Sequence, residues 1–348
     1  MTSEDHFLLL EGGGSRTWAA LATGTNVLGV ATGASTNPRS VGDAQATVTM
    51  TELITQVLDS SASHGHIDPI GVVAAHGAAS TTATAASFAG LLSTACSCAG
   101  MPGLPVHVVN DILPVLLRKP DGAVCVAIAG TGTGFAARHD TRTARASGLE
   151  WLLSDEGGGH DLAQAGLRAV VRALDHRGPQ TALTDAAAAW CGHVSGPLGD
   201  ALFETVYISG HARKPHVATF APSVLAAATA GDAVATALVD SAADALASGV
   251  RAVCADTGIT EQNPLTLILS GSLLTGSSML RHRLTELLGG VVSITDVLEH
   301  AEADHATAML ALGRALRQTT LPVIADSIPF CVNQMPTDDH PVSAGGAA

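Results

Sequence analysis

Aromatic and charged residues are both scarce in this chain of 348 residues, at 3% and 14%. Hydrophobic residues make up 47%, so the core must be built mainly from alanine, valine and leucine. A chain this apolar is not expected to be disordered. It has no run of about 18 apolar residues, which argues against a membrane span. Its length suggests two domains with a sizeable core.

Basic residues are also few. The 17 lysine and arginine residues are outnumbered by 31 aspartate and glutamate residues, which gives a formal net charge of −14. Non-specific nucleic-acid binding and attachment to an anionic membrane both need a basic surface, so we expect neither partner. Any phosphate group would have to be held by backbone N–H groups and a metal ion rather than by a basic cluster.

Cysteines are few for this length and lie mostly inside apolar stretches, which predicts reduced, structural thiols. The first six residues are polar and acidic, and the apolar run at 7–10 is too short for the core of a signal peptide. Together these features predict a cytoplasmic protein. The cysteines are Cys96, Cys98, Cys125, Cys191, Cys254 and Cys331.

Several catalytic motifs are missing. There is no Gly-x-x-x-x-Gly-Lys-Ser/Thr loop of a P-loop enzyme and no Gly-x-Ser-x-Gly elbow of a hydrolase. The run at 64–68 has metal-ligand residue types, but it lies in a polar loop without another convincing ligand. Cys96 and Cys98 fall in a helical stretch without a second cysteine pair, so zinc is not expected. His76, which ends an apolar strand, could face a cleft or cap the sheet.

The first third of the chain predicts elements in the order β-β-β-α-β-α-β-α. Apolar residues spaced three and four apart around 46–58 indicate an amphipathic helix. Short apolar runs that end at glycines indicate strands. The expected strands are 7–10, 18–23, 26–31, 71–75 and 106–109, and the expected helices are 46–58, 81–99 and 112–117.

The same pattern then starts again and is interrupted by a long helical block at 160–256. Two copies of one α/β unit would enclose a cleft, where ligands tend to bind. We predict an N-terminal domain at 1–117, a C-terminal domain at 118–333 that carries the helical insertion, and a flexible tail at 334–348. The expected later elements are strands at 123–129, 135–138, 143–146, 265–269 and 291–294, a helix at 277–288, and a helix at 302–317 that could pack back on the first domain.

Two glycine-rich loops occupy matching places in the two halves. The first is Glu11-Gly12-Gly13-Gly14-Ser15-Arg16-Thr17 and the second is Gly130-Thr131-Gly132-Thr133-Gly134. Glycines let backbone N–H groups approach an anion closely, and the hydroxyls of Ser15 and Thr17 add donors. The second loop lacks the helix and the glycine spacing of a dinucleotide fingerprint. A pair of hairpins that clamps the phosphates of one nucleotide explains both loops better than two unrelated turns.

Carboxylates follow strands at several places. Asp111 could be a general base for a substrate hydroxyl, or it could cap the next helix, as could Asn110. Asp155 and Glu156 precede three glycines in a loop suited to sugar hydroxyls, although an acidic helix start is the alternative. Glu11, at a strand end, could hold Mg²⁺ through water.

Six short motifs in this order resemble those of sugar kinases of the actin-like ATPase superfamily. The most similar branch is that of the N-acetylglucosamine kinases, grouped with the BadF/BadG/BcrA/BcrD ATPases, and the resemblance covers about residues 7–317. It implies an α/β fold with two RNase-H-like domains that close over ATP, Mg²⁺ and a sugar. The motifs are Glu11-Gly12-Gly13-Gly14-Ser15, Gly33-Ala34-Ser35-Thr36-Asn37, Val109-Asn110-Asp111, Ala129-Gly130-Thr131-Gly132, Asp155-Glu156-Gly157 and Ser270-Gly271-Ser272.

The resemblance also assigns roles to residues. It implies nucleotide contacts at Ser15, Thr131, Gly132, Gly271 and Ser272, to which the loop argument adds Gly13, Gly14 and Thr17. It implies sugar contacts at Asn37, Asp111, Thr131, Gly148 and Asp155, with Glu150 and Glu156 as further candidates beside them. Asp111 matches the base that activates the accepting hydroxyl, usually on C6.

The chain departs from the family pattern at the sugar pocket. The family usually has Gly-Trp-Gly before its Asp-Glu-Gly loop, whereas this chain has Gly148-Leu149-Glu150 and a displaced Trp151. Ser154 replaces a glycine before Asp155. An unpaired carboxylate of Glu150 in the pocket would favour a substrate with an ammonium group. We therefore predict a free amino sugar rather than N-acetylglucosamine.

The function expected from these features is ATP-dependent phosphorylation of a hexosamine hydroxyl. The sequence does not decide whether the protein is a monomer or a homodimer. A first alternative is an ATPase of the same family that activates a reductase through an iron–sulfur cluster. That role needs suitably placed cysteines, and no cysteine here lies in a glycine-rich loop. A second alternative is a sugar-binding regulator without turnover, against which Asp111 and both glycine loops argue.

Overall fold

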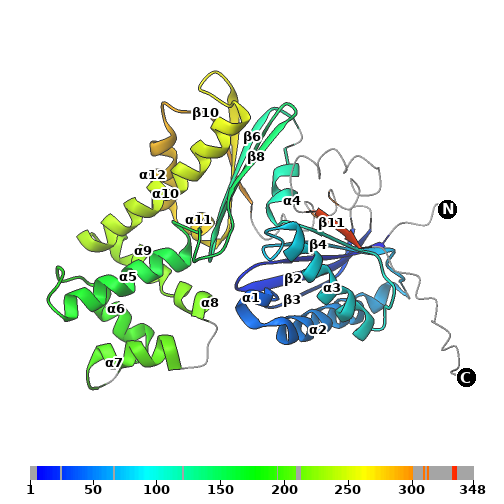
Figure 1. Ribbon diagram of the computed structural model, residues 1–348, viewed down its shortest axis with the longest axis horizontal. Coiled ribbons are helices and arrows are strands. Elements are labelled where there is room, and N and C mark those ends of the chain that lie inside the picture. The colour runs from blue at the N-terminus through cyan, green and yellow to red at the C-terminus, as the bar shows by residue number, and fades with distance from the viewer. Residues whose placement is uncertain are drawn as a thin grey trace, which may run out of the picture.

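The computed structural model describes residues 6–23, 26–65, 67–119, 121–193, 195–208, 213–300, 309, 312 and 331–334. Figure 1 shows two α/β halves side by side. The first half contains β1 (His6–Gly12), β2 (Arg16–Thr23), β3 (Asn26–Ala34), α1 (Pro38–Val41), α2 (Asp43–Ser61), a 3₁₀ turn (Ala62–His64), β4 (Gly71–His76), α3 (Thr82–Cys98), β5 (Val106–Val109) and α4 (Ile112–Leu117).

The second half repeats this plan around a helical insertion. Its strands are β6 (Ala123–Ala129), β7 (Thr133–His139), β8 (Arg142–Ser147), β9 (Pro264–Ser270) and β10 (Ser293–His300). The insertion holds α5 (Gly159–Leu174), α6 (Leu183–Trp190), α7 (Leu198–Phe203), a π-helical turn (Glu204–Ile208), α8 (Arg213–Ala218), α9 (Ala221–Thr229) and α10 (Ala233–Thr257). The chain continues through α11 (Ser272–Gly276) and α12 (Ser278–Leu288), and β11 (Cys331–Gln334) follows later.

The two sheets share one topology. The first has the strand order β11-β5-β4-β1-β2-β3 and the second the order β10-β9-β6-β7-β8. In each sheet three consecutive strands pair antiparallel and two further strands join in parallel. Apart from β11, the two orders match. The predicted α/β fold of two RNase-H-like halves, with a helical insertion in the second, is therefore confirmed.

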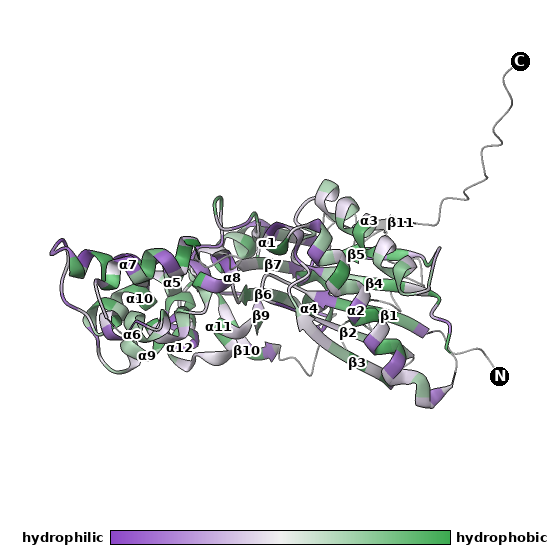
Figure 2. Cartoon of the chain, turned by 90° about the horizontal axis from the view of Figure 1, so that it is seen from below, coloured by the Kyte–Doolittle hydropathy of each residue, from purple (hydrophilic) through white to green (hydrophobic). Residues whose placement is uncertain are grey.

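The alternation of side chains along the central strands explains how the halves join. In β1, Leu8 and Leu10 face a core formed with α2 and α3. Phe7 and Leu9 face the opposite way, into a core shared with Val124 and Val126 of β6. Figure 2 shows hydrophobic residues, in green, on the strands of the first half and on the helices of both halves. Because both sheets bury side chains in this shared core, the two halves meet along their inner faces.

The helical insertion packs on the outer face of the second sheet. Its longest helix, α10, begins where the Asp232 side chain accepts a hydrogen bond from Ala235 N and ends at Gly258, whose φ is +75°. Val239, Leu246 and Val250 place one face of α10 in the core of the second half. Within the described ranges, α10 is the one helix long and apolar enough to cross a membrane, a weak indication that rests on length and composition alone.

Two expected elements and one expected domain limit are shifted in the structure. The strand expected at 291–294 overlaps only the first two residues of the longer β10, an edge strand that begins at 293 and in which Asp296 and Glu299 interrupt the apolar pattern. The helix expected at 277–288 begins at 278, because Ser277 caps it by accepting from Leu280 N. β11 pairs with β5 in the first sheet, so the predicted boundary at 333 does not follow the sheets.

The end of the chain can be compared with the sequence only in part. The helix expected at 302–317 lies outside the described residues, apart from Met309 and Leu312, which are buried in the shared core. The tail predicted at 334–348 also lies outside them, apart from Gln334. The domain limits at 117 and 118 remain a prediction.

Candidate active site

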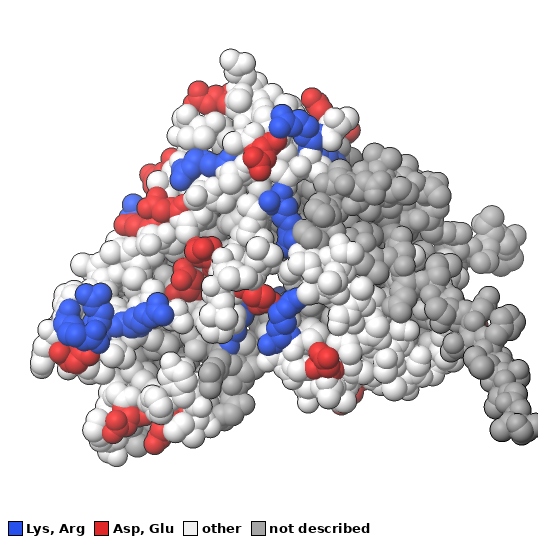
Figure 3. All heavy atoms as spheres, in the orientation of Figure 1, with Lys and Arg blue, Asp and Glu red and all other residues white. Residues whose placement is uncertain are grey.

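A cavity of about 450 Å³ lies between the two halves, and most of the predicted site residues line it. Figure 3 shows that charged side chains are sparse over this face of the molecule and that both signs occur where the halves meet. The predicted residues found in the lining are Glu11, Gly13, Gly14, Ser15, Asn37, Asp111, Thr131, Gly132, Gly148, Glu150, Asp155, Gly271 and Ser272.

The first glycine loop leaves open space at its tip. Gly13 N donates to Arg16 O at 3.2 Å, which closes the hairpin between β1 and β2. A Cβ atom built on Gly13 would meet no atom within 4 Å, and one on Gly14 would meet only Thr131, at 3.5 Å. The two glycine loops therefore face each other across the cavity with room between them for a ligand.

The second glycine loop is packed against the start of α5. Gly159 N donates to Gly130 O at 2.8 Å and His160 N donates to Thr131 O at 2.9 Å. A Cβ atom on Gly132 would lie 2.5 Å from Asp155 Oδ2. A side chain at position 132 would collide with the carboxylate of Asp155, so glycine is needed there.

Asp111 presents its carboxylate to the cavity because its neighbour takes the capping role. Asn110 Oδ1 accepts from Ile112 N at 3.2 Å, whereas the Asp111 side chain makes no capping bond to α4. Burial raises the pKa of Asp111 to about 6; the Arg145 guanidinium opposes this shift, and the charge of Glu11 adds to it. A carboxylate with this pKa can accept and release a proton near neutral pH.

Glu150 and Asp155 converge on one lysine that the sequence reasoning missed. Lys214 Nζ lies 2.6 Å from Glu150 Oε2 and 2.8 Å from Asp155 Oδ2. The other oxygen of Asp155 accepts from Thr133 N at 3.1 Å. The carboxylate of Glu150 is therefore already paired, which removes the premise of the predicted preference for an ammonium group.

Two predicted site residues lie outside the cavity lining. Thr17 is the second residue of β2, so its side chain alternates inward, and its buried hydroxyl lies 2.8 Å from Thr36 Oγ1. Glu156 is exposed, because it follows Asp155 in a turn in which only one of the two carboxylates can face inward. Neither side chain reaches the cavity, and the roles predicted for Thr17 toward ATP and for Glu156 toward the sugar remain predictions.

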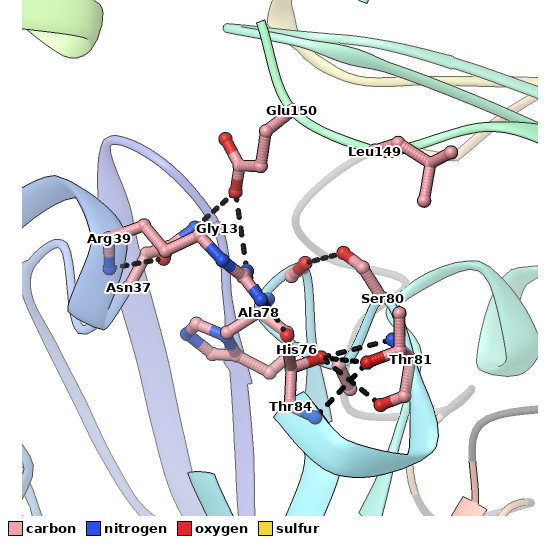
Figure 4. Close-up of polar contacts among 12 residues, drawn as sticks. Gly13, Asn37, Arg39, His76, Ala78, Ser80, Thr81, Thr84, Leu149 and Glu150 are labelled. Carbon is pink, nitrogen blue, oxygen red and sulfur yellow. Dashed lines mark hydrogen bonds and ion pairs between the residues drawn. The ribbon is translucent and has the colours of Figure 1, made fainter. Parts of the chain in front are cut away.

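The residues at the position of the family tryptophan also turn away. Leu149 is 49% exposed and is not part of the lining, and in Figure 4 it points away from Glu150. Trp151 packs against His160, with ring centroids 5.1 Å apart. Neither side chain forms an apolar wall for the cavity.

His76 lies beneath the first glycine loop rather than in the cavity. Its Nδ1 accepts from Ala78 N at 2.9 Å, and its Nε2 lies 2.9 Å from Thr36 Oγ1. Burial, together with the charge of Arg39, lowers the pKa of His76 to about 3, so the ring is neutral. Because Ala78 N can only donate, the ring hydrogen of His76 must be on Nε2.

Other lining residues were not predicted and had little signal in the sequence. Arg145 lies on β8 and donates to Ser80 O at 3.2 Å, which links the two halves. Trp18 and Thr275 add an aromatic ring and a hydroxyl to the lining. Arg145 was expected only as part of a weak strand, and nothing nearby in the sequence marks it as functional.

The lining fits a magnesium nucleotide. Among the described residues, no three His, Cys, Asp or Glu side chains are grouped so as to hold a metal alone. Mg²⁺ is usually held by one or two carboxylates, waters and substrate phosphates, and Glu11 and Asp111 both line the cavity. Gly271 has a φ of +86°, and a Cβ there would collide with Ala129 O, so the chain must come close at this point.

Several solved structures with the same fold carry the names of sugar kinases, and one is named as a ROK family transcriptional regulator. A "putative N-acetylglucosamine kinase" from Chromobacterium violaceum has a TM-score of 0.64 and 21% identity, and the match covers 89% of this chain and 99% of that one. A protein of the same name from Porphyromonas gingivalis has a TM-score of 0.64 and 20% identity, with 90% and 100% covered.

A ROK family glucokinase from Streptomyces griseus, solved with glucose and AMPPNP, has a TM-score of 0.53 and 16% identity, with 90% and 99% covered. At these identities the likeness shows the fold alone. No curated protein is similar enough to match the chain. The family model that describes the BadF/BadG/BcrA/BcrD ATPases matches residues 10–311, so this chain belongs to the BadF/BadG/BcrA/BcrD ATPase family.

Proposed function

We propose that this protein transfers the terminal phosphoryl group of ATP to a hydroxyl of a hexosamine, with the C6 hydroxyl as the acceptor and Asp111 as the general base. The observation that carries the proposal is the carboxylate of Asp111, which faces a cavity enclosed by two glycine hairpins. Its pKa of about 6 suits a group that must take a proton near neutral pH.

In this mechanism Asp111 accepts the proton of the sugar hydroxyl as the sugar oxygen bonds to the phosphorus atom of the terminal phosphate. The bond from that phosphorus to the bridging oxygen breaks, and ADP leaves. The backbone N–H groups of the glycine loops and the hydroxyls of Ser15 and Ser272 hold the phosphates. Mg²⁺, when bound, would neutralise phosphate charge, and Glu11 is the residue we expect to hold it through water.

We propose Asn37, Gly148 and Asp155 as the sugar contacts. Glu150 is already paired with Lys214, so an ammonium group on the sugar would find no unpaired carboxylate at Glu150. We therefore rank N-acetylglucosamine ahead of glucosamine, which reverses the order expected from the sequence. Use of ATP agrees with the cytoplasmic location that the sequence predicts.

The test is a screen of the purified protein for ADP release with Mg²⁺ over hexoses, hexosamines, N-acetylhexosamines and cyclitols. Mass spectrometry of the product should find a phosphorylated sugar, and the Asp111→Asn variant should not form it. Sugar binding by calorimetry without ADP release from any sugar would contradict the kinase function and favour a regulator.

Family membership keeps one other function in view, an ATPase that activates a reductase. Such a protein needs cysteines that hold an iron–sulfur cluster. No cysteine lines the cavity in the described part of the chain, and Cys96, Cys125 and Cys254 are buried. Brown colour and visible absorption after anaerobic purification would favour this function over the kinase.

A further inference from the structure

Lysine is almost absent from this protein. Of the 17 basic residues only two are lysines, Lys119 and Lys214, and the rest are arginines. Lys214 lies on α8 in the helical insertion, lines the cavity, and has a side chain only 11% exposed. One of the two lysines is therefore placed inside the candidate active site by an element that is absent from the first half.

The contacts of Lys214 form a charged triad with two acidic residues. Burial disfavours the charged ammonium, but the nearby carboxylates of Asp155 and Glu150 outweigh it and raise the pKa of Lys214 above its usual value. Burial also opposes the charge on Glu150, but the Lys214 ammonium prevails and holds the pKa of Glu150 below its usual value. Lys214 and Glu150 are therefore both charged near neutral pH, and the ammonium of Lys214 lies between the carboxylates of Glu150 and Asp155.

Glu150 adopts a backbone conformation that is costly for its residue type. Its φ is +71°, a left-handed conformation that favours glycine. Ser154 N donates to Glu150 O at 2.8 Å, and Leu149 N donates to Ser154 Oγ at 2.8 Å, which closes the loop. Contacts of the Glu150 side chain are needed to offset the strain.

Those contacts reach across the cavity to the first half. Figure 4 shows the Glu150 carboxylate between Asn37 and Arg39 at the start of α1. Asn37 Nδ2 lies 3.4 Å and the Arg39 guanidinium 3.5 Å from Glu150 Oε1. Lys214, which binds the other oxygen of Glu150, thereby connects the helical insertion to both walls of the cavity.

We infer that Lys214 is a positioning residue of the sugar site, an inference that rests on the proposed function. Lys214 and Thr133 N bind opposite oxygens of Asp155 and so fix the plane of its carboxylate toward the sugar. Lys214 offsets one of the two negative charges of Glu150 and Asp155, and the Arg39 guanidinium lies 3.5 Å from Glu150. Lys214 thereby sets the pocket to prefer a sugar without an ammonium group. Without Lys214, two carboxylates would share one half-buried site and repel each other.

The test compares Lys214→Met, which keeps length but removes charge, with Lys214→Arg and with Lys119→Met as a control. We expect Lys214→Met to raise KM for N-acetylglucosamine at least about tenfold and to leave KM for ATP within about twofold. We expect Lys214→Arg to restore most of the loss, and Lys119→Met to behave like the parent protein.

The specificity ratio separates this role from a merely structural one. In Lys214→Met the ammonium of glucosamine can take the place of the lost lysine charge. The kcat/KM ratio of glucosamine to N-acetylglucosamine should therefore rise about tenfold or more. An equal loss for both sugars, or an unchanged KM for N-acetylglucosamine, would overturn the inference.

A labelling experiment tests the triad without relying on kinase activity. With an amine-directed acetylating reagent and peptide mass spectrometry, we expect Lys119 to react quickly and Lys214 slowly, because an ion-paired ammonium is a poor nucleophile. Glu150→Gln should speed labelling at Lys214 and leave Lys119 unchanged. Fast labelling of Lys214 in the parent protein would overturn the triad, whereas failure to phosphorylate any sugar would overturn only the proposed function.

Discussion

The two glycine hairpins look alike in the sequence but differ in what surrounds them. The first, at Gly13 and Gly14, borders open space on the cavity side. In the second hairpin, the carboxylate of Asp155 occupies the space beside Gly132, and the loop is hydrogen-bonded to the start of α5. Both hairpins follow the first strand of a half, so the topology alone predicts the same role for both.

This difference shows that one motif can serve two purposes in a duplicated fold. The glycine at 13 in the first loop borders open space. Gly132 in the second makes room for Asp155, whose loop leads from β8 into α5 of the helical insertion. The carboxylates beside the hairpins differ in the same way: Asp111 has a raised pKa, while Asp155 is bound by Thr133 N and Lys214.

The largest effect should come from the carboxylate beside the first hairpin. Asp111→Asn should reduce kcat about 10²–10⁴-fold, the usual loss when a general base is removed. ATP affinity measured by calorimetry should stay nearly unchanged, because the hairpin itself is intact. Asp59→Asn, at an exposed position on α2, is the matched control. Full activity in Asp111→Asn would end the assignment of the base.

Substituting one glycine in each hairpin tests the comparison directly. Gly132→Ala places a methyl group against Asp155 within a loop that also holds the phosphates, so it should raise KM for the sugar as well as KM for ATP. Gly13→Val fills the open side of the first hairpin, so it should weaken ATP binding at least about tenfold, or about 1.4 kcal/mol. Steady-state kinetics with each substrate varied in turn would measure both. If the two variants showed the same pattern, the hairpins would not have separate roles.

The pH dependence of the reaction rate tests whether Asp111, with its raised pKa, is the general base. The base must be ionised to accept a proton, and the pKa of Asp111 is raised to about 6. We expect kcat/KM to be level above that pH and to fall about tenfold per unit below it. An acid limb centred near 4 would instead indicate that a carboxylate with an ordinary pKa is the base.

The smallest expected effect is on stability. Because the folded-state pKa of Asp111 lies above its unfolded value, its contribution to stability is fully present at low pH and is lost as pH rises through about 6. The Asp111→Asn variant should therefore have a higher Tm than the parent protein at pH 8. The difference should disappear near pH 4, and thermal melts followed by circular dichroism at both values would measure it.

Much of the fold could be predicted because its signals are local. The stripe at 46–58 predicted α2, and the apolar run that became β6 was predicted with its correct ends. The length of β10 was underestimated because an edge strand tolerates the charged side chains of Asp296 and Glu299, both of which are exposed. The helix expected at 302–317 could not be compared.

The site was predictable where residues follow strand ends and unpredictable where distant segments meet. Asp111 and the glycine loops lie at strand ends, so the topology brings them together. Lys214 lies 59 residues from Asp155 on a six-residue helix, and no spacing rule connects them. Thr17 was expected in the turn of the first hairpin, but it lies in β2, where alternation along the strand directs its side chain to the buried face.

The neutral His76 beneath the first hairpin gives a fixed direction to a short chain of hydroxyl groups. Its Nε2–H must donate to Thr36 Oγ1, so the single hydrogen of that hydroxyl is left for Thr17 Oγ1. Thr17 Oγ1 also accepts from Thr36 N, and its own hydrogen is therefore directed away from Thr36. The hydrogen bonds beneath Gly12 therefore run in one direction, from the Ala78 amide through His76 and Thr36 to Thr17. Replacing His76 with a side chain that can only accept a hydrogen bond would reverse the direction in which both threonine hydroxyls donate.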